Sequence, residues 1–293
     1  MEIRKVPASA GAQWLLETFG LLRKSPLGFG ALGLIYAALW LGTALLGQAM
    51  PPALAVPLQL VSFIVGALLV ALMIHAAREV DAGRSAGLGA LLASVQGGAG
   101  ARMLRTLVPQ AIFAVAMAAL VVVLIGPENL VKFTEAMAEL QAKANSGTRV
   151  DPQTLMQGPI VRVAVGALVV MGVSVIVFMF TMTVLPDMLL EDRRLGPALR
   201  RGVAAGARNL LAVIVYLVLA FVILMAVSIG FGIVLGALQL VFGQAVAIAG
   251  NALLYGLFMC GLAGSMYFAW KQMLGGEAGD AAAPAPPAAG VAM

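Results

Sequence analysis

Residues 210–238 read LLAVIVYLVLAFVILMAVSIGFGIVLGAL and lie in a stretch, 209–270, that contains no Asp, Glu, Lys or Arg. An α-helix rises 1.5 Å per residue, so about 20 apolar residues cross the roughly 30 Å of hydrocarbon in a bilayer. This stretch is therefore long enough for two crossings. Gln239 to Gln244, which includes Gly243, predicts a tight turn between helices at 210–238 and 246–270.

Three further stretches lack charged side chains, at 25–77, 106–127 and 163–186. The first is long enough for two helices, and Met50-Pro51-Pro52 interrupts it because proline removes an amide donor and restricts the residue before it. The two shorter stretches hold one helix each. The predicted helices in these stretches are 27–49, 54–77, 105–126 and 160–185.

The composition is typical of a membrane protein, since 62% of the residues are hydrophobic and 11% are charged, outside the range of soluble domains. The sequence predicts an all-α fold, a polytopic membrane bundle of six transmembrane helices in three hairpins with short amphipathic interfacial helices. We expect residues 1–274 to form a single transmembrane domain with an outer loop at 127–159. The Ala/Pro-rich segment 275–293 is predicted to be a disordered tail.

Lys and Arg are concentrated on one side of the predicted membrane. Fourteen of the eighteen lie before the first helix, between helices two and three, between helices four and five, or at Lys271. The other four are Lys132, Lys143, Arg149 and Arg162, balanced by nearby carboxylates. The positive-inside rule therefore predicts a multi-pass membrane protein with both termini in the cytoplasm.

A short amphipathic segment precedes each predicted hairpin. The first has Trp14, Leu15, Phe19 and Leu22 on one helical face, the second covers 88–95, and the third has Leu195, Leu199 and Val203. Such segments lie in the head-group plane with their apolar side down. They either orient the hairpins or form a lipid-sensitive surface or docking platform. The expected partners are membrane lipids, with anionic head groups at the cytoplasmic face, and a membrane-protein partner or a second copy in a homodimer.

Charged side chains gather where the predicted helices meet the cytoplasm. Asp187 and Glu191 are four residues apart and are followed by Asp192 and Arg193. The second helix ends with His75, Arg78, Glu79 and Asp81. This interfacial cluster is a candidate head-group or metal site, and the alternative is a set of salt bridges that satisfy one another.

The glycine, cysteine and basic residues are further candidates for packing, disulfide or nucleic-acid contacts. Gly232 and Gly236 have GxxxG spacing, which predicts either a helix-packing face inside the bundle or a homodimer face. The single Cys260 excludes an intrachain disulfide. The basic residues form neither a dense run nor an aromatic platform, so no nucleic acid is expected as a partner.

No catalytic motif is present, and no ionisable group lies centrally in a predicted membrane helix. We therefore expect no catalytic residue, no cofactor and no metal. The favoured interpretation is a noncatalytic membrane protein that organises or senses the envelope through lipid or partner contacts. One alternative is a permease or channel for an apolar or zwitterionic solute, and another is a lipid-modifying enzyme that uses Asp187 and Glu191.

The opening of the chain has an amphipathic segment with Trp14 and Phe19, then Arg23-Lys24-Ser25-Pro26-Leu27 directly before the first membrane helix. It resembles a family of uncharacterised proteobacterial inner-membrane proteins, a resemblance that extends over the six-helix plan. The three-hairpin organisation is also similar to the membrane domain of some glycerophosphodiester phosphodiesterases. These resemblances imply an architecture and supply no site residues.

Overall fold

The computed structural model describes residues 3–84, 86–146 and 159–275, which are helical with short connections and contain no strand. The predicted tail, apart from Gly275, and the part of the predicted outer loop from 147 to 158 lie outside the described residues. The all-α prediction is confirmed for the described chain.

Six of the described helices are long and apolar enough to cross a membrane, as predicted. They are α2 (Phe29–Ala49), α3 (Pro52–Asp81), α5 (Gly100–Leu124), α8 (Pro159–Thr181), α11 (Leu210–Phe242) and α12 (Gln244–Met273). The apolar span that contains α8 continues through the short helix that follows it, α9 (Val184–Leu190).

The helix ends follow local chemistry. Pro52 occupies the first position of α3, where its missing amide donor costs nothing. The turn between α11 and α12 is the single residue Gly243, whose φ of 79° lies in the left-handed region that favours glycine. Helices α3 and α12 extend beyond their predicted ends, to Asp81 and Met273, whereas α5 and α8 end earlier than predicted, at Leu124 and Thr181. The additional turns bring charged and polar side chains into the structure.

The chain divides into two compact units. The first contains the described residues up to Leu107 and from Phe180 onward, and α12 is its central helix, packed against α2, α3 and α11. A Cβ atom added to Gly256 of α12 would overlap the carbonyl oxygen of Gly33 in α2. Two glycines therefore set the closest approach of these helices.

The second unit covers Val108–Met179. It contains most of α5, the helix α6 (Pro127–Asn145) and most of α8. Ser174 Oγ of α8 donates a hydrogen bond to Met117 Sδ of α5 at 3.2 Å, and Gly166 of α8 faces Ile125. Small and polar residues thus mark the contacts between these two membrane helices.

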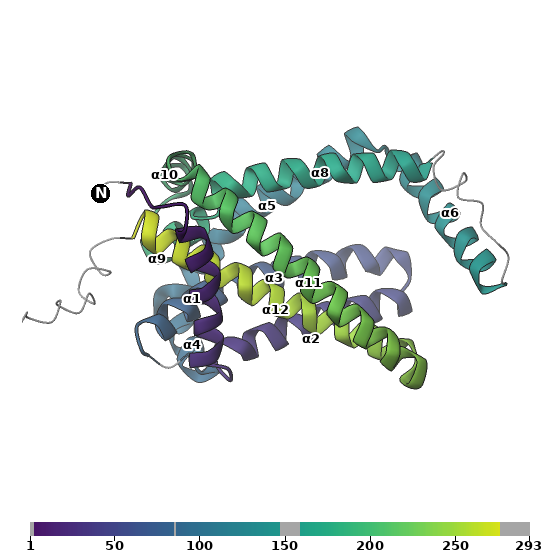
Figure 1. Ribbon diagram of the computed structural model, residues 1–293, viewed down its shortest axis with the longest axis horizontal. Coiled ribbons are helices and arrows are strands. Elements are labelled where there is room, and N and C mark those ends of the chain that lie inside the picture. Colours follow the sequence, from purple (N-terminus) through teal and green to yellow (C-terminus); the bar gives the residue numbers. More distant parts are fainter. Residues whose placement is uncertain (1–2, 85, 147–158, 276–293) are drawn as a thin grey trace, which may run out of the picture. The chain divides into compact units, whose positions relative to one another are not determined.

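Three short helices gather at one end of α12 in the first unit. They are α1 (Ala10–Lys24), α9 and α10 (Leu195–Arg208), and we call them the cap layer (Figure 1). A further short helix, α4 (Leu88–Ser94), and the π-helical turn Val95–Ala99 follow α3. The predicted amphipathic helices are therefore present.

The packed face of α1 differs from the predicted one. Its buried residues are Ala10, Gly11, Trp14, Thr18 and Leu21, whereas Phe19 is 49% exposed. A Cβ at Gly11 would overlap the carbonyl oxygen of Ala212 in α11. Small residues let the α1 backbone lie against α11 and α12, and part of the predicted apolar face is left outside.

Candidate functional site

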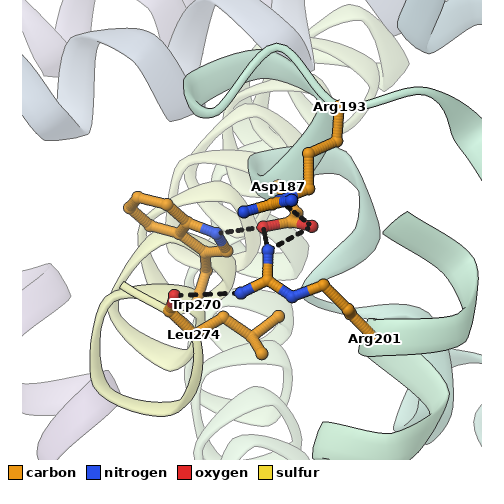
Figure 2. Close-up of polar contacts among 5 residues, drawn as sticks. All are labelled: Asp187, Arg193, Arg201, Trp270 and Leu274. Atoms are coloured by element: carbon orange, nitrogen blue, oxygen red, sulfur yellow. Dashed lines mark hydrogen bonds and ion pairs between the residues drawn. The ribbon is translucent and has the colours of Figure 1, made fainter. Parts of the chain in front are cut away.

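The cap layer surrounds a carboxylate that is completely buried. Asp187 lies in α9, and its side chain has 0% exposure. Trp270 Nε1 of α12 donates a hydrogen bond to Asp187 Oδ1 at 3.1 Å (Figure 2). A buried charge is stable only when it is paired and hydrogen-bonded, so the remaining partners of this carboxylate decide its role.

Two arginines supply those partners. Arg201 of α10 contacts both carboxylate oxygens of Asp187, at 3.0 Å and 3.3 Å, and its second terminal nitrogen donates to the Leu274 carbonyl at 3.4 Å (Figure 2). Arg193 Nε lies 3.3 Å from Asp187 Oδ2. Asp187 therefore joins α9, α10 and the end of α12, and its acceptor positions are occupied by protein groups.

A second carboxylate is bound by residues of α12 that lie close to Trp270. Asp81, the last residue of α3, accepts hydrogen bonds at the same oxygen from Tyr267 at 2.7 Å and from Lys271 at 2.5 Å. Tyr267 and Trp270 thus carry the partners of Asp81 and Asp187 on one helix. Hydrogen bonds thus hold the end of α3 to α12, as another hydrogen bond holds α9 to α12.

The remaining predicted residues form separate pairs. Glu79 pairs with Arg84 through two hydrogen bonds, at 2.6 Å and 2.8 Å. Asp192, which has a φ of 56°, pairs with Arg105. His75 lies within α3 near Arg78 and Glu79, and Glu191 ends α9 as its half-buried C-cap residue.

The predicted interfacial cluster is therefore divided in the structure. Asp187 and Arg193 form one buried group, Asp81 belongs to a second, and Glu79 and Asp192 form exposed pairs of their own. In the described ranges, no group of three or more His, Cys, Asp or Glu side chains could hold a metal ion. Salt bridges within the protein pair Glu79, Asp81, Asp187 and Asp192.

Sequence reasoning missed Asn209, which separates α10 from α11. Its side-chain oxygen accepts a hydrogen bond from the Val6 amide at 2.8 Å, and its nitrogen donates to the Arg4 carbonyl at 3.0 Å. The Arg4 amide in turn donates to the Met273 carbonyl at 3.0 Å. Asn209 therefore attaches the N-terminal segment to the cap layer. In the sequence, the available signal for this role was a polar residue between Arg208 and the apolar run that follows.

Trp14 and Thr18 complete the attachment of α1. Trp14 Nε1 donates to Gln272 Oε1 of α12 at 2.9 Å, and the Trp14 ring packs 6.0 Å from the Tyr216 ring of α11. The Thr18 hydroxyl lies 3.3 Å from the Ser265 hydroxyl. Polar contacts on the buried side of α1 thus fix its rotation about its own axis.

Gly232 and Gly236 make no close contact in the described chain. A Cβ added to Gly232 or Gly236 would meet no atom of the described chain within 4 Å. Close packing in the first unit instead uses Gly33 and Gly256, which lie in α2 and α12. The homodimer interpretation of Gly232 and Gly236 stays a prediction.

Six helices of membrane-spanning length and composition within the described ranges place this chain in the class of multi-pass membrane proteins. A family described as a family of unknown function (DUF7544) matches residues 93–276. The match covers more than half of the chain, and the chain belongs to this family. No match was found among curated proteins or among solved structures.

The family match gives no indication of proteobacterial origin or of a relation to glycerophosphodiester phosphodiesterases. Both finer resemblances therefore stay predictions. The matched range contains Asp187, Arg201 and Trp270, and it excludes α1 and α3. The buried group around Asp187 thus lies within the matched range.

Proposed function

We propose that this chain is a noncatalytic protein of the bacterial inner membrane that organises or senses the envelope through lipid contacts of its cap layer. The observation that carries this proposal is the division of α1 into two sides. Trp14 is fully buried against the bundle, whereas Leu16 is 69% and Phe19 is 49% exposed. An apolar flank on a helix locked at the end of a membrane bundle suits insertion at the head-group boundary.

Helix α10 repeats this arrangement. Its buried face consists of Ala198, Gly202, Ala205 and Gly206, and a Cβ at Gly202 would lie 2.6 Å from a Val184 methyl of α9. Leu199 and Val203 are exposed on the outer side, and Arg200 and Arg208 are exposed beside them. Apolar side chains next to arginines suit a membrane surface that carries anionic lipids.

The absence of catalysis is part of the proposal. Asp187 was the strongest candidate for a catalytic carboxylate, and it is buried and occupied by Arg193, Arg201 and Trp270. A general base must reach its substrate by a direct or water-mediated hydrogen bond. The pairing of Asp187 therefore supports a structural role.

We also propose that the cap layer lies on the cytoplasmic side, with both termini in the cytoplasm. Basic residues from distant parts of the sequence support this orientation. Lys24, Arg201 and Lys271 all belong to this end of the first unit. Accumulated positive charge beside membrane helices favours the cytoplasmic face.

The proposed lipid contact can be tested by extracting the full chain into polymer-bounded native membrane discs and measuring the phospholipid classes retained. We expect anionic lipids to be enriched over the bulk membrane, and the double variant Arg200→Gln/Arg208→Gln to reduce this enrichment. Lys132→Gln, in the exposed part of α6, is the matched control and should leave it unchanged. A retained composition equal to the bulk membrane would contradict the proposal.

A permease or channel for an apolar or zwitterionic solute stays the alternative prediction, because such transport needs no buried charge. Proteoliposome flux across a broad solute panel separates the two functions. The lipid-contact proposal expects flux no faster than in empty vesicles. Saturable flux of one solute would favour the permease.

A further inference from the structure

A cleft of about 340 Å³ lies between α1 and the ends of α3 and α12. Its walls are Glu17, Gly20, Leu21 and Lys24 of α1, Asp81 of α3, and Phe268 and Lys271 of α12. Two carboxylates and two ammonium groups therefore line one cavity together with two apolar side chains. The chemistry of the cleft depends on which of these charges are already paired.

One pair is satisfied within the protein. Lys271 Nζ lies 2.5 Å from Asp81 Oδ2, and the Tyr267 hydroxyl donates to the same oxygen. Glu17 and Lys24, by contrast, form no ion pair within 4 Å with any residue that the structure describes. Burial raises the pKa of Glu17 above its usual value even though Lys271 and Lys24 are nearby. The cleft thus holds one acid and one base that form no ion pair within the described part of the chain.

The spacing of this free pair is set by the helix. Glu17 and Lys24 are seven residues apart, which places them on one flank of α1 about 10 Å apart along its axis. Gly20 lies between them, and a Cβ there would meet nothing within 4 Å. Leu21 and Phe268 below are buried. A small molecule with opposite charges at its two ends matches this arrangement.

We propose that the cleft binds a small zwitterion that carries a primary ammonium group and a phosphate or similar oxyanion. The ammonium donates hydrogen bonds to the Glu17 carboxylate. The oxyanion binds the Lys24 ammonium, and Lys271 on the opposite wall adds a second positive charge. Charge-assisted hydrogen bonds of this kind are the stronger ones, and the bond to Glu17 is lost when the ligand has no N–H to donate.

Phosphoethanolamine has this chemistry, either as a soluble molecule or as a phospholipid head group. Glu17, Gly20 and Lys24 lie on the flank of α1 that is separated from the exposed Phe19 by the helix itself. This placement suits a ligand that arrives from water. The inference goes beyond the proposed lipid contacts, because it concerns the charged cleft and not the exposed apolar side chains of α1.

The test is calorimetric titration of the full chain in discs of phosphatidylcholine and phosphatidylglycerol, which contain no primary amine. We expect saturable binding of O-phosphoethanolamine. The affinity for O-phosphocholine should be lower by about tenfold or more, because its trimethylammonium group has no N–H to donate. Absence of saturable O-phosphoethanolamine binding, or equal affinities for both probes, would overturn the proposal.

Two variants locate the binding. Glu17→Gln keeps the shape of the side chain and should weaken O-phosphoethanolamine binding about tenfold. It should weaken O-phosphocholine binding less, because that probe loses the attraction of the charge and no hydrogen bond. Gly20→Leu should fill the cleft and abolish binding, and it should fold because its Cβ meets no atom and leucine favours helix. Gly89→Leu in α4, another open position, is the matched control and should bind as wild type does. Unchanged binding by Gly20→Leu would place the ligand elsewhere and overturn the assignment.

A final arm distinguishes the two sources of the ligand. Phosphatidylethanolamine is added to the discs, and the titration with O-phosphoethanolamine is repeated. Competition would assign the cleft to the lipid head group, and unchanged soluble binding would assign it to a water-borne zwitterion. Both results support the shared chemistry, and the outcome is independent of whether Arg200 and Arg208 enrich anionic lipids.

Discussion

Two carboxylates of the same end of the molecule, Asp187 and Glu17, have opposite surroundings. Asp187 is fully buried and has two arginines and a tryptophan as partners. Glu17 lines an open cleft and has no ion-pair partner among the described residues. A paired buried charge holds elements together, whereas an unpaired charge at a cavity is available to a ligand. The difference separates structural charges from candidate binding charges.

The largest effect is expected from removing the Asp187 charge. Asp187→Asn leaves Arg201 and Arg193 beside a neutral amide, and breaking a buried pair costs about 3–5 kcal/mol of unfolding free energy. Thermal unfolding of the purified chain, followed by circular dichroism, measures the loss. Asp192→Asn is the control, since its exposed pair with Arg105 contributes about 1 kcal/mol or less. Equal melting temperatures for the two variants would remove the structural role of Asp187.

An intermediate effect is expected at the contact between α2 and α12. Gly256→Ala forces the Gly33 backbone away, because the new Cβ would overlap its carbonyl oxygen. Overpacking of this kind costs about 1–3 kcal/mol. Gly232→Ala and Gly236→Ala meet open space and should not lower the melting temperature. A loss of stability at Gly232 or Gly236 in a concentration-dependent manner would instead support the predicted homodimer face.

The smallest effect is expected at Glu17, where the substitution should raise the melting temperature instead of lowering it. Burial raises the folded-state pKa of Glu17, so the stability it contributes is present in acid and is lost as the pH rises through that pKa. Glu17→Gln should therefore raise the melting temperature at about pH 8 and leave it unchanged at about pH 4. Melting curves at both pH values check this. A lower melting temperature for Glu17→Gln at about pH 8 would mean that Glu17 has a partner.

Glu139→Gln is the matched control for that prediction. A hydrogen bond from Lys143 lowers the pKa of Glu139, so its contribution is present at neutral pH and is lost in acid. Its removal should not stabilise the chain at about pH 8. The two glutamates thus separate a carboxylate that has found its partner from one that has not.

The membrane helices could be predicted from sequence because the charge-free runs are a local property of the chain. The pairing of Asp187 with Trp270 could not, since these residues are 83 positions apart and meet only through the packing of α9 against α12. The position of Glu17 and Lys24 on one flank of α1, by contrast, follows from helical spacing alone. The opposite wall, formed by Asp81 and Lys271, depends on tertiary packing.

The orientation of α1 shows a further limit. Trp14 and Phe19 were predicted to share one apolar face, yet Trp14 packs on the bundle and Phe19 lies outside. An apolar pattern cannot separate the two sides, because protein interior and lipid are both apolar surroundings. Small residues distinguish them, and Gly11 and Thr18 mark the side of close backbone approach.

The membrane depth of α1 tests the cap-layer proposal most directly. Nitroxide labels at Phe19→Cys and Gln13→Cys, in the full chain reconstituted into lipid vesicles, report contact with lipid-soluble oxygen or a water-soluble nickel chelate. The native Cys260 is buried and should not react. The proposal predicts that the label at position 19 meets oxygen and the label at position 13 meets the chelate. Equal access of the chelate to both positions would contradict it.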